Sequence, residues 1–101
     1  MRSSILGILI VLAACGGPSE VIDVKYRGRV DLAPFACTTV TRSSSIERVC
    51  FNQRAGELIL RLRGTYYVWC GVPPTLVERL KSADSMGQFF NAEVKGRFGC
   101  R

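Results

Sequence analysis

The chain has 101 residues, which limits it to one small domain with a thin hydrophobic core. Its 14 Lys and Arg outnumber its 8 Asp and Glu, giving a net charge of +6, and it contains no histidine. The positive charge favours anionic partners such as nucleic acid, phospholipid head groups or acidic polymers. The lack of histidine removes the commonest general base and the commonest metal ligand, which argues against most enzymes and metal sites.

The N-terminus has the pattern of a bacterial export signal. A single cation precedes an apolar run over residues 5–14, which is too short to span a bilayer. The run ends in Leu-Ala-Ala-Cys at residues 12–15, which resembles the lipobox of bacterial lipoproteins. That resemblance implies a signal peptide over residues 1–14, acylation of Cys15 and anchoring of the mature chain in a membrane through its lipid. Gly16 implies the outer membrane, on the periplasmic side of the envelope. The alternatives are an ordinary secretory signal and an apolar N-terminus that is no signal at all.

The remaining cysteines predict a cross-linked domain. With Cys15 assigned to lipid, four are left: Cys37, Cys50, Cys70 and Cys100. An even count in a small exported domain predicts two disulfides. A zinc site is disfavoured because the chain has no Cys-x-x-Cys pair and no histidine. We therefore expect no metal and no cofactor.

The body of the chain begins with a tether and an irregular extension over residues 15–42, in which residues 21–26 could be extended. Three antiparallel strands are predicted over residues 46–51, 57–62 and 65–70, where apolar and β-branched residues alternate or cluster. Arg63 and Gly64 fit a two-residue hairpin loop, although arginine is not ideal where φ is positive. This loop fixes the register: Leu62 faces Thr65, Leu60 faces Tyr67 and Leu58 faces Trp69.

The register sorts the side chains onto two faces of the sheet. Tyr67 and Trp69 share the leucine face, together with Val49, and are interpreted as core with polar tips at the rim. The opposite face carries the candidate binding residues, which are Arg48, Arg61, Tyr66 and, at the loop, Arg63. Arginine beside an aromatic ring suits planar anions and carboxylates. The alternative is an ordinary solvated sheet face.

Two short helices follow the strands. Proline suits the first turn of a helix that begins near Pro73 and Pro74. Ser85 and Gln88 have the spacing of a capping box at the start of the second helix, and Gly96 is placed to end it. Both helices can cover the leucine face. The predicted fold class is therefore α+β: a small antiparallel three-stranded meander, two short helices packed on one face, and two disulfides.

The predicted register also bears on the pairing of the cysteines. It places Cys50 and Cys70 in one row with Glu57 between them, and two strand spacings exceed the reach of a disulfide. Cys50–Cys70 is therefore disfavoured. The leading choice is Cys37–Cys50 with Cys70–Cys100, and Cys37–Cys70 with Cys50–Cys100 stays open.

Two motifs stand out in the second half of the chain: the run Tyr67-Val68-Trp69-Cys70-Gly71-Val72-Pro73 and the Ser-x-Gly-x-Phe-Phe-Asn pattern at residues 85–91. With these motifs, residues 43–98 resemble the KTSC domain, a family named for an appendage of some lysyl-tRNA synthetases that also occurs alone in bacteria. The matching motif residues are Tyr67, Trp69, Val72, Pro73, Ser85, Gly87, Phe89, Phe90 and Asn91. A KTSC-like domain is thus assigned to residues 43–101. The family has no established function, and its synthetase context implies RNA binding. Its central Tyr-x-Tyr is Tyr67-x-Trp69 here, which lacks the second hydroxyl.

These observations favour a lipid-anchored binding or structural module in the cell envelope. Its expected partners are the membrane, through the lipid on Cys15, and an anionic molecule or protein in the envelope. The alternative is an RNA-binding module that stays in the cytosol, because export separates the chain from RNA. No catalytic residue is identified, since Ser43, Ser44 and Ser45 lack a visible base and no close pair of carboxylates suited to acid–base catalysis is recognised.

Overall fold

The fold is a six-stranded curled sheet with two short helices, seen in a computed structural model that describes residues 20–100. The predicted signal peptide and the lipidation site Cys15 lie outside the described residues. The strands are β1 (Val21–Val24), β2 (Gly28–Asp31), β3 (Ala36–Thr39), β4 (Ile46–Asn52), β5 (Glu57–Leu62) and β6 (Thr65–Trp69), and the helices are α2 (Pro74–Ser82) and α3 (Met86–Glu93). No helix within residues 20–100 is long and apolar enough to cross a bilayer.

The predicted fold class is wrong in the extent of its sheet. The strand order is β2-β1-β6-β5-β4-β3, and all neighbours are antiparallel except β1 and β6. The meander β4-β5-β6 is therefore the middle of a mixed sheet that curls into a half-barrel. The three additional strands have four residues each. Strands this short carry little hydrophobic alternation, so their sequence reads as irregular chain.

The central hairpin has the predicted register. Leu58 pairs with Trp69, Leu60 with Tyr67 and Leu62 with Thr65. Arg63 (φ 50°) and Gly64 (φ 85°) both adopt positive φ, as a type I′ turn requires. Gly64 also donates its N–H to a carboxylate oxygen of Glu47 at 3.0 Å, which helps to hold this turn.

The pairing of β4 with β5 differs from the prediction by two residues. Cys50 lies opposite Ile59, and Glu57 lies opposite Asn52. Val49 still shares the leucine face, because a shift of two residues preserves the alternation. The disulfides are Cys37–Cys50, which joins directly opposed residues of β3 and β4, and Cys70–Cys100, which fixes the C-terminal tail to the end of β6.

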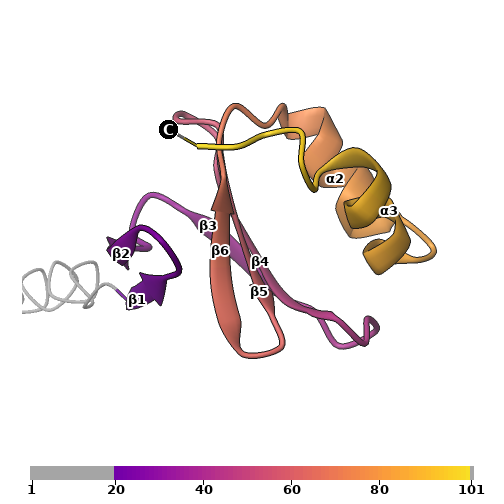
Figure 1. Cartoon of the computed structure of the whole chain (residues 1–101), viewed down its shortest axis with the longest axis horizontal. Coiled ribbons are helices and arrows are strands. Elements are labelled where there is room, and N and C mark those ends of the chain that lie inside the picture. Colours follow the sequence, from indigo (N-terminus) through magenta and orange to yellow (C-terminus); the bar gives the residue numbers. More distant parts are fainter. Residues whose placement is uncertain (1–19, 101) are drawn as a thin grey trace, which may run out of the picture.

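The helices cover one face of the sheet, as Figure 1 shows. The main core lies between them and the strands, and its buried residues are Ile46, Val49, Leu58, Leu60, Val72, Val77, Leu80, Met86, Phe90 and Val94. Ser85 is the N-cap of α3 and accepts a hydrogen bond from the Gln88 N–H at 3.3 Å, as the capping-box spacing predicts.

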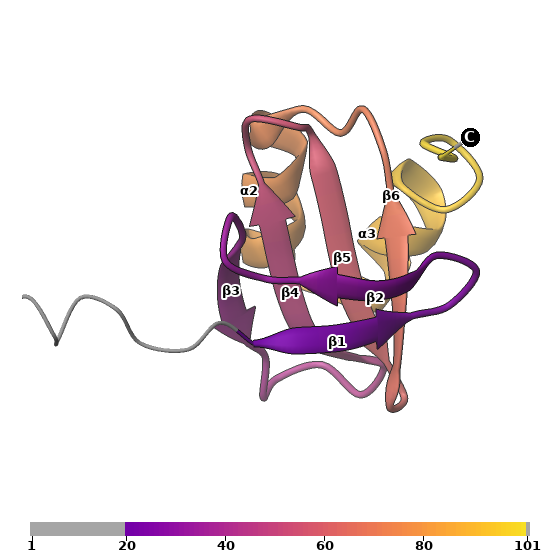
Figure 2. The ribbon, with the colours of Figure 1, turned by 90° about the vertical axis from the view of Figure 1, so that its left-hand side faces the viewer.

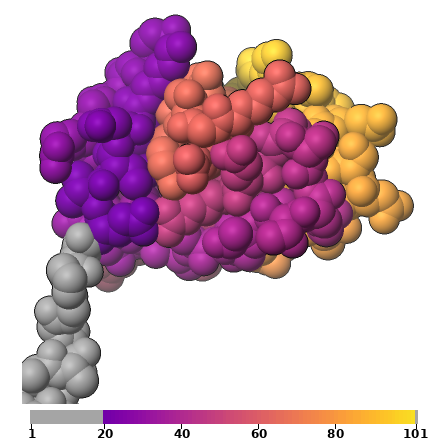
Figure 3. All heavy atoms as spheres, turned by 90° about the horizontal axis from the view of Figure 1, so that it is seen from below, coloured from indigo at the N-terminus to yellow at the C-terminus, as the bar shows by residue number. Residues whose placement is uncertain are grey.

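The opposite face of the sheet is covered as well. The hairpin β1-β2 crosses in front of β4, β5 and β6 (Figure 2) and packs directly against them (Figure 3). A second buried cluster results, formed by Ile22, Val24, Leu32, Cys50 and Ile59. The molecule therefore has three layers, and much of the face that the sequence indicated as solvated is interior.

Candidate functional site

The predicted patch on the outer face does assemble, but its cations already have partners. Arg48 donates two hydrogen bonds to the carboxylate of Glu20, at 2.7 and 2.8 Å, and a third to the hydroxyl of Tyr66 at 3.0 Å. Arg61 lies over the Tyr66 ring, 5.7 Å from its centroid, and its Nε is 3.2 Å from a carboxylate oxygen of Glu47. These contacts neutralise both guanidinium groups and leave little charge for a ligand.

The bidentate contact with Arg48 lowers the pKa of Glu20 below its ordinary value, and the same hydrogen bonds raise the pKa of Arg48. Glu20 directly precedes β1, and its carbonyl accepts a hydrogen bond from the Leu32 N–H at 2.8 Å. The contact therefore ties the beginning of the N-terminal hairpin to β4. We interpret Arg48, Arg61 and Tyr66 as structural residues that hold this hairpin on the sheet.

Replacing Glu20 with glutamine is expected to destabilise the protein at neutral pH, because an amide cannot form the charged pair with Arg48. The lowered pKa of Glu20 makes this stabilisation complete above the ordinary pKa of a glutamate. It is lost as the pH falls through the lowered value. Urea midpoints of the wild type and Glu20→Gln should therefore differ at neutral pH and converge in strong acid. Glu78→Gln, at an exposed glutamate of α2, is the matched control. A difference that persists undiminished in acid would contradict the assignment.

Two cavities lie on either side of the edge of β6, and both include Tyr67 and Trp69 among their lining residues. The first, of about 330 Å³, is lined by Lys25, Tyr26, Arg27, Tyr67, Val68, Trp69 and Cys100. The second, of about 420 Å³, is lined by Leu62, Arg63, Thr65, Tyr67, Trp69, Phe90 and Lys95. We call these two cavities together the β6-edge site. Arg63 is the one residue of the predicted patch that belongs to it.

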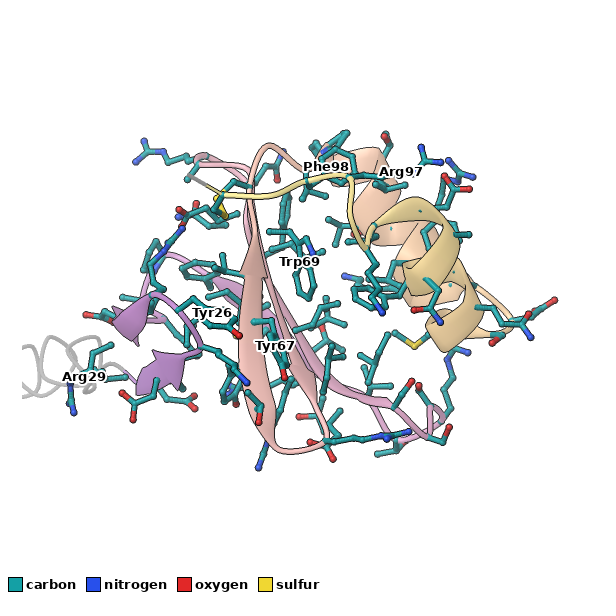
Figure 4. All side chains as sticks on the ribbon, in the orientation of Figure 1. Tyr26, Arg29, Tyr67, Trp69, Arg97 and Phe98 are labelled. Carbon is teal, nitrogen blue, oxygen red and sulfur yellow. A yellow bond between two sulfur atoms is a disulfide. The ribbon has the colours of Figure 1, made fainter. Side chains whose placement is uncertain are left out.

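The two aromatic residues lie on the leucine face, as predicted, but they are only half-buried. Trp69 packs edge-on against Phe90, with ring centroids 5.1 Å apart, and Tyr67 lies 6.3 Å from Trp69. Figure 4 shows Tyr67 and Trp69 on the helix side of β6 and Tyr26 on the hairpin side. The interpretation of both as core is thus incomplete, because each also contributes to the wall of both cavities.

The β6-edge site is positively charged. Lys25 places its ammonium 5.4 Å from the centroid of the Tyr26 ring and 5.9 Å from that of Tyr67. Arg27 pairs with Glu57 at 3.1 Å and also reaches Cys70 Sγ at 3.5 Å. Among residues 20–100, no aspartate or glutamate lines either cavity. Cations beside aromatic faces can hold an anion with a flat or apolar part.

Lys25, Tyr26 and Arg27 were not predicted as site residues. Tyr26 is 95% exposed and has a φ of 67°, which is unusual for a residue other than glycine. The sequence did contain a signal, namely an aromatic residue between two cations just before Gly28. Nothing local indicated that this turn would lie next to β6, because the contact depends on the pairing of β1 with β6.

The other motif residues mostly shape the backbone and the core. Val72 and Phe90 are buried, Pro73 is the N-cap of α2, and Ser85 caps α3. A Cβ on Gly87 would lie 3.0 Å from the hydroxyl of Ser45, so a larger residue would crowd that loop. The remaining two are Phe89, which lies under the Arg79 guanidinium at 5.3 Å, and Asn91, which is exposed. No group of three or more metal-ligating side chains occurs in the described part of the chain.

Comparisons with known proteins identify the family. A comparison with curated proteins found no match. A crystal structure of a KTSC domain protein from Yersinia pestis is 31% identical in sequence and superposes with a TM-score of 0.62, covering 66% of this chain and 94% of that one. The model of the KTSC domain matches residues 42–98, which is more than half of the chain. The chain therefore belongs to the KTSC domain family.

Proposed function

We propose that this KTSC domain protein is exported, is anchored by lipid on Cys15, and acts as a non-enzymatic binding module in the cell envelope. The lipobox pattern at residues 12–15 supports the anchor. The two disulfides support an oxidising compartment such as the periplasm, because cytosolic thiols are kept reduced. Outer-membrane attachment follows from Gly16, as the sequence predicts.

The ligand that we propose for this module is anionic and has a flat or apolar part. The observation that carries the proposal is the composition of the β6-edge site. Four cations, Lys25, Arg27, Arg63 and Lys95, surround the shared pair Tyr67 and Trp69, and no acidic side chain lines the cavities within residues 20–100. Of these cations, only Arg27 has a carboxylate within salt-bridge distance in that part of the chain.

A cytosolic RNA-binding module is the second candidate. The same site favours it, because bases stack on aromatic side chains while phosphates contact cations. The disulfides argue against it. The two candidates therefore differ both in compartment and in ligand.

Metabolic labelling with palmitate tests the compartment. The wild type should incorporate the label and fractionate with membranes, and Cys15→Ala should lose both properties. Cys37→Ala is the matched control, because it removes a cysteine that we assign to a disulfide. An unlabelled wild-type chain in the cytosol would refute the anchor.

Quenching of the fluorescence of Trp69, the single tryptophan, by adenosine monophosphate or by acidic peptides tests the binding site.

A further inference from the structure

We propose that the β6-edge site binds the C-terminal end of an extended peptide, which pairs with the open backbone of β6 at Val68. The inference rests on the proposed binding function and specifies its ligand class. It depends on the backbone hydrogen bonds of β6, which can be assigned residue by residue.

The two-residue turn determines which backbone N–H and C=O groups of β6 point toward β5 and which point away from it. Leu62 and Thr65 flank this turn and therefore form a hydrogen-bonded pair. Such pairs alternate along an antiparallel ladder with pairs that exchange no hydrogen bonds. Val68 lies opposite Ile59 in a pair of the second kind. Its N–H and C=O therefore point away from β5, toward the hairpin side.

The positions on either side of Val68 are occupied along this edge. The Tyr66 carbonyl accepts a hydrogen bond from the Lys25 N–H at 2.9 Å, and the Cys70 N–H donates to the Phe98 carbonyl at 2.9 Å. Between them, neither the N–H nor the C=O of Val68 has a hydrogen-bond partner within residues 20–100. The cavity of about 330 Å³ includes Val68 in its lining, so this donor and acceptor face an open space.

The turn after β1 explains why Val68 remains open. A continued parallel ladder would pair the Val68 N–H with the next carbonyl after Val24. Instead, the positive φ values of Tyr26 (67°) and Gly28 (98°) turn the chain back into β2, and the pairing of β1 with β6 stops at Val24 and Tyr66. The conformation of Tyr26, which is unfavourable for a tyrosine, is thus part of what forms the cavity.

The shape of the opening favours the end of a peptide. One extended residue offers an N–H and a C=O on the same side, which complement those of Val68. The two occupied positions, Tyr66 and Cys70, are four residues apart, or about 13 Å along the strand. A strand running through would collide with the turn at one end and with the tail at the other. A chain whose last residue pairs with Val68 stays clear of the turn, and its earlier residues leave the strand before they reach the position of Cys70, which the tail occupies.

The charge of the cavity favours a free carboxylate on that chain end. One carboxylate oxygen can accept from the Val68 N–H while the peptide N–H donates to the Val68 C=O. The second oxygen then faces the side of the cavity that holds Lys25, whose ammonium has no carboxylate within salt-bridge distance in the described chain. The terminal side chain would lie on the same face of the sheet as Val68, because directly opposed residues share a face. Tyr26 lines the cavity on that side, so an apolar or aromatic residue suits the terminal position.

Titration of the full, oxidised chain with model peptides tests the inference through the emission of Trp69. The probe is acetyl-Gly-Ala-Ala-Phe as the free acid, compared with its C-terminal amide and with a form N-methylated at the last peptide nitrogen. We expect saturable binding of the acid and at least about tenfold weaker binding of the other two, because each loses a charged or hydrogen-bonding contact. Lys25→Gln should weaken binding of the acid by about tenfold and leave binding of the amide nearly unchanged. Arg54→Gln, at an exposed arginine in the turn after β4, is the matched control and should bind as the wild type does.

Three results would overturn the inference. Equal binding of the free acid and the amide would show that the terminal carboxylate is not recognised. Tighter binding of adenosine monophosphate or of a short oligouridylate than of the free acid would identify a nucleotide ligand. In the latter case the proposed binding function would stand while the peptide inference failed. A Trp69 signal that responds to none of these probes would refute both. If Lys25→Gln has the same unfolding temperature as the wild type, its effect is on peptide binding and not on the stability of the fold.

Discussion

Replacing Ile59 with alanine is expected to lower the free energy of unfolding by about 3 kcal/mol, the cost of a large cavity in a packed core. Ile59 is fully buried, although it lies on the sheet face that the sequence indicated as solvated. It packs with Ile22, Val24 and Leu32 from the N-terminal segment. Denaturation by guanidinium chloride, monitored by Trp69 emission, measures the change.

Leu60→Ala is the matched comparison for this experiment. Leu60 is the next residue of β5, is equally buried and packs under the helices. The two variants should lose similar stability, within about 1 kcal/mol, if both faces are interior. A two-layer fold would make Ile59→Ala nearly neutral while Leu60→Ala remained severe. That outcome would refute the position of the β1-β2 hairpin.

Removal of the disulfide between Cys70 and Cys100 is expected to destabilise the folded protein by about 3.6 kcal/mol. This bond closes a loop with a sequence separation of 30, and the constraint that it places on the unfolded chain grows with loop length. Thermal unfolding of the Cys70→Ala/Cys100→Ala double variant, compared with the wild type under non-reducing conditions, measures the loss.

The bond between Cys37 and Cys50 provides an internal comparison. Its sequence separation is 13, for which the same relation gives about 2.9 kcal/mol. Cys50 is fully buried, so its replacement by alanine also removes packing from the second cluster. The two double variants should therefore be destabilised by similar amounts. No loss of stability in either variant would mean that the chain folds without its cross-links.

The middle of the fold could be predicted because its signals are local. The alternation of Leu58, Leu60 and Leu62 and the turn at Arg63 and Gly64 determine which residues of β5 and β6 face each other. The cap at Ser85 is likewise contained within four residues. The loop between β4 and β5 is longer, and its sequence does not determine the register of the two strands as closely. The observed pairing of β4 with β5 therefore differs from the predicted one by two residues.

The N-terminal strands could not be predicted because their partners are distant in sequence. β1 pairs in parallel with β6, more than 40 residues later, through one bridge between Val24 and Tyr66. The apolar residues Ile59 and Val68 lie on the outer face, but the neighbouring arginines Arg48 and Arg61 led to the prediction of a solvated or ligand-binding face. Those arginines instead bind Glu20 and Glu47 around the rim of the buried cluster.

The candidate site was predicted only in part for the same reason. Tyr67 and Trp69 were identified from the motif, but their role as a shared wall depends on what lies on the two sides of β6. The hairpin supplies one side through Lys25, Tyr26 and Arg27, and α3 with the segment after it supplies the other through Phe90 and Lys95. Only the three-dimensional arrangement brings these segments together.

The family match begins at residue 42, whereas the hairpin that covers the outer face of the sheet ends before that point. A fragment trimmed to the family boundaries would expose Ile59 and Val68 to water and leave Cys50 without the cysteine that it bonds. Such a fragment would expose an apolar surface that promotes aggregation, together with a free thiol. In this chain, residues that precede the family match therefore complete one of the two buried clusters and one of the two disulfides found within residues 20–100.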